Sequence, residues 1–225
     1  RTRAARSTPA AGSSSPGPFL PVGAPLTEAL GDTIIQLEIA PNRADALSIV
    51  GIAREAAAIL ATTLRHPPAE RLPSDLSPAR LSVRIEDPVA CPRFAAAYLE
   101  GVRVGPSPEW MQRRLASAGM RPINVVVDVT NYVMLELGQP LHAYDAERLR
   151  GRALVARMAR VGEHLRTLDG IDRILRPTDL VIADAARARG LAGIMGGEDS
   201  ESRETTASVA LECASFEPRG VRRTT

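Results

Sequence analysis

Four prolines within residues 65–79 constrain the fold of this chain more than any other feature. Proline lacks a backbone N–H and fixes φ, so this stretch is unsuited to a helix interior or a central strand. The sequence on either side has its own hydrophobic periodicity. We therefore predict a linker at 65–79, between a small segment at 19–64 and a larger domain at 80–225.

Residues 1–18 contain Arg1, Arg3 and Arg6, no acidic residue, and many Ser, Ala, Pro and Gly. The first residue is arginine, so we expect this not to be an intact translated start. The composition resembles that of an organelle transit peptide. A disordered linker, or the edge of a longer chain, is the interpretation that the general behaviour of termini favours.

The segment at 19–64 predicts one strand and one helix. Apolar residues alternate with polar ones over 35–39, which indicates a half-buried strand. Residues 41–45 then form a predicted turn with capping side chains. Apolar residues at helical spacing follow it: Ile49, Ile52, Ala53, Ala56 and Leu60.

The domain at 80–225 predicts an α+β fold. Alternation indicates strands near 81–86 and 97–104. Ser107-Pro108-Glu109 predicts a helix start, with Ser107 as the N-cap, proline at the first helical position and an acid in the first turn. A second helix is expected over 124–137, ended by Gly138, although its valines would also suit a strand. The later pattern is mostly β, with a hairpin turn at 168–171 and strands at 180–183 and 209–211. The expected architecture is a small α/β segment followed by a mixed-sheet domain.

Composition excludes several classes of protein. With 44% hydrophobic and 24% charged residues the chain is globular, and no apolar run approaches the ~20 residues of a membrane helix. A net charge of +2 argues against strong autonomous nucleic-acid binding. Cys91 and Cys213 are far apart and the three histidines are isolated, so we predict no metal site. We expect a soluble protein of a reducing compartment, the cytoplasm.

The densest polar stretch runs from Asp128 to Asp145. Asp128, Asn131 and Tyr132 fall within one helical turn, and a Gly-Gln-Pro-Leu segment then leads to His142. A histidine and an amide could converge there on a substrate carbonyl or a water. Alternatively, the polar groups satisfy one another, with His142 donating to a backbone carbonyl. Spacing alone favours this second interpretation.

Two further stretches could carry chemistry. Glycines at 193–197 follow a predicted strand, where they allow either a ligand-facing backbone or a tight turn. No phosphate-loop pattern accompanies them. In the strand at 209–214, Glu212 shares a face with Ala210 and Ala214. It could be an acceptor on the floor of a cavity, or simply solvated, which is the commoner case.

Taken together and in order, these stretches resemble the β subunit of bacterial phenylalanyl-tRNA synthetase. Residues 37–48 and 53–55 resemble the B1 domain of that family, whereas residues 1–18 do not match it. The motifs that resemble its B3/B4 module are 87–88, 121–124, 127–132, 138–142, 167–170, 193–197 and 211–212.

The resemblance implies that the B3/B4 domain is an editing site, which hydrolyses tyrosine misattached to tRNA(Phe). His142 and Asn131 fall on catalytic positions of that family. Thr130, Pro140 and Gly196 fall on substrate-binding positions, and Glu212 falls on the carboxylate that recognises the phenol of tyrosine. Which group activates the hydrolytic water stays open among His142, Asn131 and the terminal hydroxyl of the tRNA.

The resemblance also implies cofactors and partners. It predicts no cofactor for this part of the chain, because ATP and Mg²⁺ serve the complete synthetase at another site. The expected partners are tRNA(Phe) and the synthetase α subunit, in a heterotetramer, with no membrane and no DNA. The alternative is a non-catalytic module that scaffolds the synthetase or docks tRNA. A free-standing editing protein is a third hypothesis.

Overall fold

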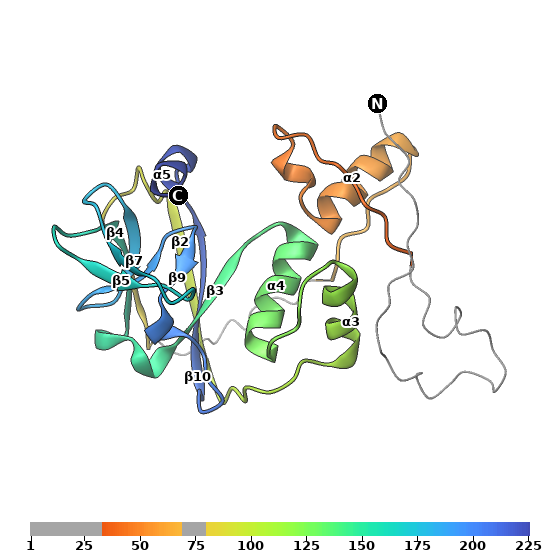
Figure 1. The fold of residues 1–225 in the computed structure, drawn as a ribbon. Helices are drawn as coiled ribbons and strands as arrows, with labels where there is room; N and C mark the ends of the chain where they lie inside the picture. Colours follow the sequence, from red (N-terminus) through yellow and green to blue (C-terminus); the bar gives the residue numbers. More distant parts are fainter. Residues whose placement is uncertain (1–32, 69–79) are drawn as a thin grey trace.

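The computed structural model describes residues 33–68 and 80–225. The predicted disordered segment at 1–18 and most of the predicted linker lie outside this part of the chain. The described residues form two larger β-sheets, a two-stranded sheet and a group of helices (Figure 1).

The N-terminal part holds a short 3₁₀ turn, η1 (Ala44–Ala46), and the helix α2 (Ile49–Ile59). The Ser48 side chain caps α2 by accepting a hydrogen bond from the Gly51 N–H. The predicted strand at 35–39 is wrong, because no described strand lies beside it to pair with. Ile35 is consequently 73% exposed. Alternation gives a strand only where a neighbouring strand accepts its hydrogen bonds.

A five-stranded mixed sheet forms one side of the larger domain, in the order β1-β4-β7-β8-β9. β1 and β4 pair in parallel and the other neighbours are antiparallel. The bounds are β1 (Ser82–Ile85), β4 (Ala153–Met158), β7 (Leu180–Ala183), β8 (Ala188–Leu191) and β9 (Met195–Gly196). The mixed sheet and the helices confirm the predicted α+β class.

A second sheet is antiparallel, in the order β2-β10-β3. Its strands are β2 (Arg93–Glu100), β10 (Ser208–Ser215) and β3 (Leu141–Asp145). Tyr144 and Ala210 of this sheet and Leu154 and Ile182 of the five-stranded sheet belong to one buried cluster. The two sheets therefore share a hydrophobic core. A separate hairpin of β5 (His164–Arg166) and β6 (Asp172–Ile174) confirms the turn predicted at 168–171.

The helix α4 (Val125–Leu137) lies beside β3, and both α3 (Glu109–Ser117) and α2 pack on α4 (Figure 1). The Asn124 side chain caps α4, and Gly138 ends it in the left-handed region at φ 77°. The predicted Ser107 cap of α3 is wrong, because this hydroxyl donates to the buried Asp128 carboxylate instead. The remaining helical elements are η2 (Ala146–Arg148), η3 (Arg150–Arg152), η4 (Glu198–Ser200) and α5 (Pro218–Thr224).

Candidate functional site

The candidate site is built on the pairing of β3 with β10. Their antiparallel register places His142 directly opposite Glu212, and Ala96 of β2 lies on the other side of Glu212. Opposite residues of an antiparallel pair project from the same face of the sheet. His142 and Glu212, which are 70 positions apart in the sequence, are therefore neighbours on one face.

Glu212 is a buried carboxylate that accepts a hydrogen bond from one side chain. Its side chain is 6% exposed, and the Tyr144 hydroxyl donates to Oε2 at 2.6 Å. Burial raises the pKa of Glu212 to about 7, and the hydrogen bond from Tyr144 opposes that rise. The solvated interpretation of Glu212 is thus wrong, and the carboxylate is an acceptor inside the fold.

His142 is held in a neutral state by its surroundings. Its Nε2 atom is buried and has no hydrogen-bond partner among the described residues. Burial lowers the pKa of the imidazole to about 4. The ring packs edge-on against Tyr144, with 4.5 Å between the ring centroids. The interpretation in which the polar groups of the helix end satisfy His142 is therefore wrong for Nε2.

Gly196 is the position that makes room for His142. An ideal Cβ built on Gly196 would lie 2.4 Å from Cε1 and 2.6 Å from Nε2 of the imidazole. The tight-turn interpretation applies instead to Gly193, which has φ 71° in the turn between β8 and β9. Gly196 is required for close packing and Gly193 for its backbone conformation.

Gly196→Ala is expected to lower the free energy of unfolding by about 1–3 kcal/mol, because the added methyl overpacks against a buried ring. Gly105→Ala is the matched control, since a Cβ there would meet nothing within 4 Å. Urea unfolding of both variants checks this expectation. An equally small effect in the two variants would show that His142 moves aside at no cost.

The other predicted site residues lie around this trio of His142, Gly196 and Glu212. Pro140 directly precedes β3, and the neighbouring Gln139 side chain donates to the Ala214 carbonyl at 3.2 Å. Thr130 and Asn131 lie on α4, where the Thr130 hydroxyl donates to the Val127 carbonyl. Within the described residues, no hydrogen bond joins either of them to His142 or Glu212. The structure thus brings three of the six predicted residues together.

Tyr144 is the site residue that sequence reasoning missed. It lies within the polar stretch that we singled out, but nothing in that stretch gives it a role. The available signal is its spacing of two from His142, which puts both side chains on one face of a strand. Asp128, by contrast, is structural, because it accepts hydrogen bonds from Ser107 and from the Ile123 N–H.

The raised pKa of Glu212 predicts a pH-dependent stability. The folded carboxyl binds its proton more tightly than the unfolded one, whose pKa is 4.5. Its contribution to stability is therefore fully present below pH 4.5 and is lost as the pH rises through about 7.

The unfolding free energy of wild type, relative to that of Glu212→Gln, should consequently fall by up to about 3 kcal/mol between pH 4.5 and 8. The lowered pKa of His142 acts in the opposite direction, but it is common to both proteins and largely cancels in the difference. Urea unfolding of both proteins at the two pH values measures this difference in unfolding free energy. A difference that does not change with pH would show that Glu212 titrates normally.

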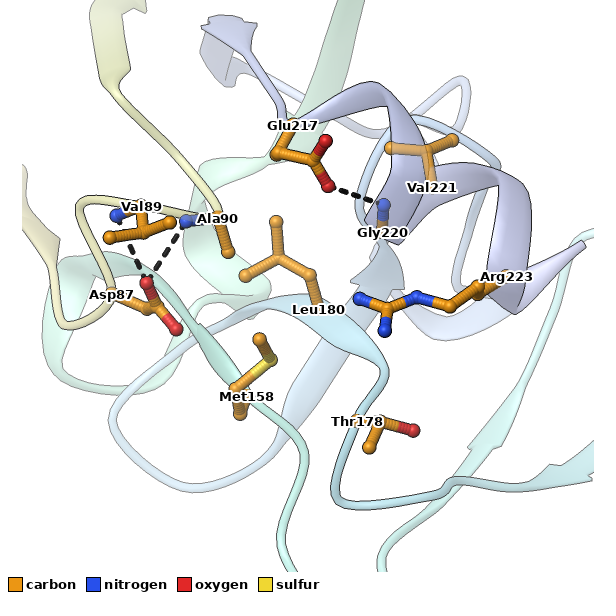
Figure 2. A pocket seen from close by; sticks show the side chains of 10 residues that line it. All are labelled: Asp87, Val89, Ala90, Met158, Thr178, Leu180, Glu217, Gly220, Val221 and Arg223. Carbon is orange, nitrogen blue, oxygen red and sulfur yellow. Dashed lines mark hydrogen bonds between the residues drawn. The ribbon is translucent and has the colours of Figure 1, made fainter.

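A pocket of about 130 Å³ lies elsewhere, between the loop after β1, β4, β7 and α5 (Figure 2). None of its lining residues belongs to the predicted site. Its carboxylates are used in local turns: Asp87 accepts from the Val89 and Ala90 N–H groups, and Glu217 accepts from the Gly220 N–H. The pocket therefore offers no group that the predicted chemistry uses.

The described part of the chain contains neither a candidate metal site nor a candidate membrane-spanning helix. No three His, Cys, Asp or Glu side chains gather there in a way that could hold a metal ion. None of the helices described combines the length and the apolar character needed to cross a membrane.

The fold and the site together define a class: an α+β domain in which a buried carboxylate and a neutral histidine face each other across paired strands. Residues 90–225 match the family model of the B3/4 domain. The chain belongs to this family.

Curated relatives confirm the resemblance to the β subunit of the synthetase. The chain is 51% identical over 209 residues to the phenylalanine–tRNA ligase beta subunit of Geobacter metallireducens. It is 52% identical over 205 residues to that of Anaeromyxobacter dehalogenans. Each alignment covers about nine-tenths of this chain, and the chain spans 26% of each relative's length.

A crystal structure of an N-terminal fragment of the phenylalanyl-tRNA synthetase beta subunit from Pyrococcus horikoshii was also found. It aligns with a TM-score of 0.47 at 15% identity, and covers 84% of this chain and 58% of that one.

Proposed function

We propose that this chain carries the editing site of a phenylalanine–tRNA ligase β subunit and hydrolyses tyrosine misattached to tRNA(Phe). The observation that carries the proposal is Glu212, a buried carboxylate that already accepts a hydrogen bond from a phenol, that of Tyr144. An environment that suits one phenol suits another. The names of the relatives support the ligase, and they suggest tRNA(Phe) and a synthetase α subunit as partners.

The need for such a site follows from the chemistry of the two amino acids. Tyrosine is phenylalanine with one added hydroxyl, and a hydrophobic pocket rejects an added hydroxyl by only about 10²-fold. A second site that demands the hydroxyl works in the opposite direction. Tyrosine donates to the second oxygen of its carboxylate, whereas phenylalanine leaves that oxygen desolvated and without a donor.

The reaction transfers water onto the ester carbonyl and releases tyrosine and the terminal hydroxyl of the tRNA. We propose that His142 acts as a neutral hydrogen-bonding group toward the ester or the water. A group with a pKa of about 4 is a weak base at pH 7. Water activation then falls to another group, such as the tRNA hydroxyl, with Asn131 and Thr130 orienting the ester from α4.

The alternative function is a non-catalytic module that scaffolds the ligase or docks tRNA. It predicts no hydrolysis at all. The Glu212–Tyr144 hydrogen bond is compatible with it, but His142 has a buried Nε2 with no hydrogen-bond partner among the described residues, which favours a group that binds a substrate.

The experiment that tests the proposal is deacylation of Tyr-tRNA(Phe) by the full 225-residue chain. The chain is used in excess, so that weak docking of the tRNA does not hide the chemical step. We expect hydrolysis faster than in buffer and faster than with heat-inactivated protein. Rates equal to both controls would favour the scaffold.

A further inference from the structure

Tyr144 is placed where it can organise both ends of the candidate site. It lies on β3 two residues beyond His142, and it is directly opposite Ala210 of β10, two residues before Glu212. Diagonal neighbours on paired strands are within reach of long side chains. Tyr144 uses this reach: its hydroxyl contacts Glu212 and its ring contacts His142.

We propose that Tyr144 is a positioning residue that sets specificity, because its hydroxyl fixes the Glu212 carboxylate for a substrate phenol. This inference rests on the proposed editing function. Tyr144 is not a catalytic residue, since it acts on the substrate through Glu212.

The hydrogen-bonding capacity of the carboxylate supports the proposal. An ionised carboxylate has two oxygens that accept hydrogen bonds. Tyr144 donates to Oε2, and within the described residues no other hydrogen bond to the Glu212 carboxylate is present. Oε1 is therefore the atom for a second phenol, and its direction is set as long as Oε2 stays bonded.

The surroundings hold Tyr144 itself in place. Its side chain is 2% exposed within the core between the two sheets. Gly190 of β8 lies close to the hydroxyl, because an ideal Cβ there would be 3.5 Å from it. With its hydroxyl bonded and its ring packed on His142, Tyr144 has little freedom to leave Glu212.

A tyrosine that only filled the core would support the hydrolysis of both esters equally. A positioning residue affects the two esters differently, because only tyrosine presents a phenol to Glu212. The ratio of the rate constants for Tyr-tRNA(Phe) and Phe-tRNA(Phe) therefore separates these roles, whereas thermal stability does not.

The test compares Tyr144→Phe with Tyr98→Phe in the full chain. Tyr98 lies on β2, also opposite Ala210, and its hydroxyl has no hydrogen bond among the described residues. Single-turnover deacylation of both esters should show about a tenfold fall in the Tyr-to-Phe ratio for Tyr144→Phe. Tyr98→Phe should keep the ratio of the wild type. An unchanged ratio in Tyr144→Phe, or an equal loss on both esters, overturns the proposal.

A second readout keeps the inference testable if the chain does not edit. Titration of the Glu212 carboxyl by NMR should show a higher pKa in Tyr144→Phe than in wild type. In wild type the hydrogen bond from Tyr144 lowers the pKa of Glu212, and the variant lacks that bond. A wild type that hydrolyses neither ester contradicts the proposed function alone. An unshifted Glu212 pKa in Tyr144→Phe contradicts the positioning role.

Discussion

Glu212→Ala is expected to reduce the preference for Tyr-tRNA(Phe) over Phe-tRNA(Phe) by about 1–3 kcal/mol, or roughly 5- to 150-fold in the ratio of rate constants. In the proposed function the phenol lies at the far end of the side chain from the ester, so the carboxylate would select the substrate and would not act on the ester. Hydrolysis itself should therefore survive better than the preference. Single-turnover deacylation of both esters measures the ratio.

Glu212→Gln is the control for this prediction. It keeps an acceptor and nearly the same volume, so it should retain part of the preference. An equal loss of rate on both esters, with their ratio unchanged, would indicate that Glu212 is catalytic or structural. No change on either ester would exclude it from the site.

His142→Ala should slow the hydrolysis of both esters by about 10²-fold, the size expected for a lost hydrogen-bonding group at the reacting atoms. The Tyr-to-Phe ratio should change little, because the imidazole does not read the phenol. His164→Ala on β5 is the matched control, since that histidine is exposed. Rates for both variants are compared with their unfolding free energies.

Truncation of a buried ring also leaves a cavity, so a second measurement is needed. Added imidazole should restore part of the rate of His142→Ala by occupying the space of the lost side chain. If the variant mainly loses thermal stability and imidazole restores no activity, the histidine is structural.

Local signals predicted much of the fold. The helix α4 (Val125–Leu137) matches the expected 124–137, because Asn124 caps its start and Gly138 ends it, and both signals are contained in neighbouring residues. The hairpin around Gly170 was predicted for the same reason. The strand at 35–39 was predicted wrongly. A strand needs a neighbouring strand to pair with, and the alternation of residues within one segment does not show whether such a neighbour exists.

The candidate site shows the same contrast between local signals, which the sequence reveals, and long-range contacts, which it does not. The chemistry of Glu212, a carboxylate between small residues, could be read from the sequence, but its burial could not. That burial depends on β3 lying beside β10, and on a second sheet that covers this face. The contacts of Gly196 with His142 and of Tyr144 with Glu212 likewise follow from strand pairing. The candidate residues could therefore be named individually from the sequence, and their arrangement could not.

We propose that this chain selects the tyrosyl ester, and a direct comparison of two substrates tests this selectivity best. The full chain is mixed in excess with Tyr-tRNA(Phe) or with Phe-tRNA(Phe), and the two single-turnover rate constants are measured at pH 7.5. We predict that the tyrosyl ester is hydrolysed at least about tenfold faster, because only tyrosine carries a hydroxyl that can donate to the second oxygen of the buried carboxylate. Equal rate constants for the two esters, or faster loss of the phenylalanyl ester, would contradict the proposed selectivity for tyrosine.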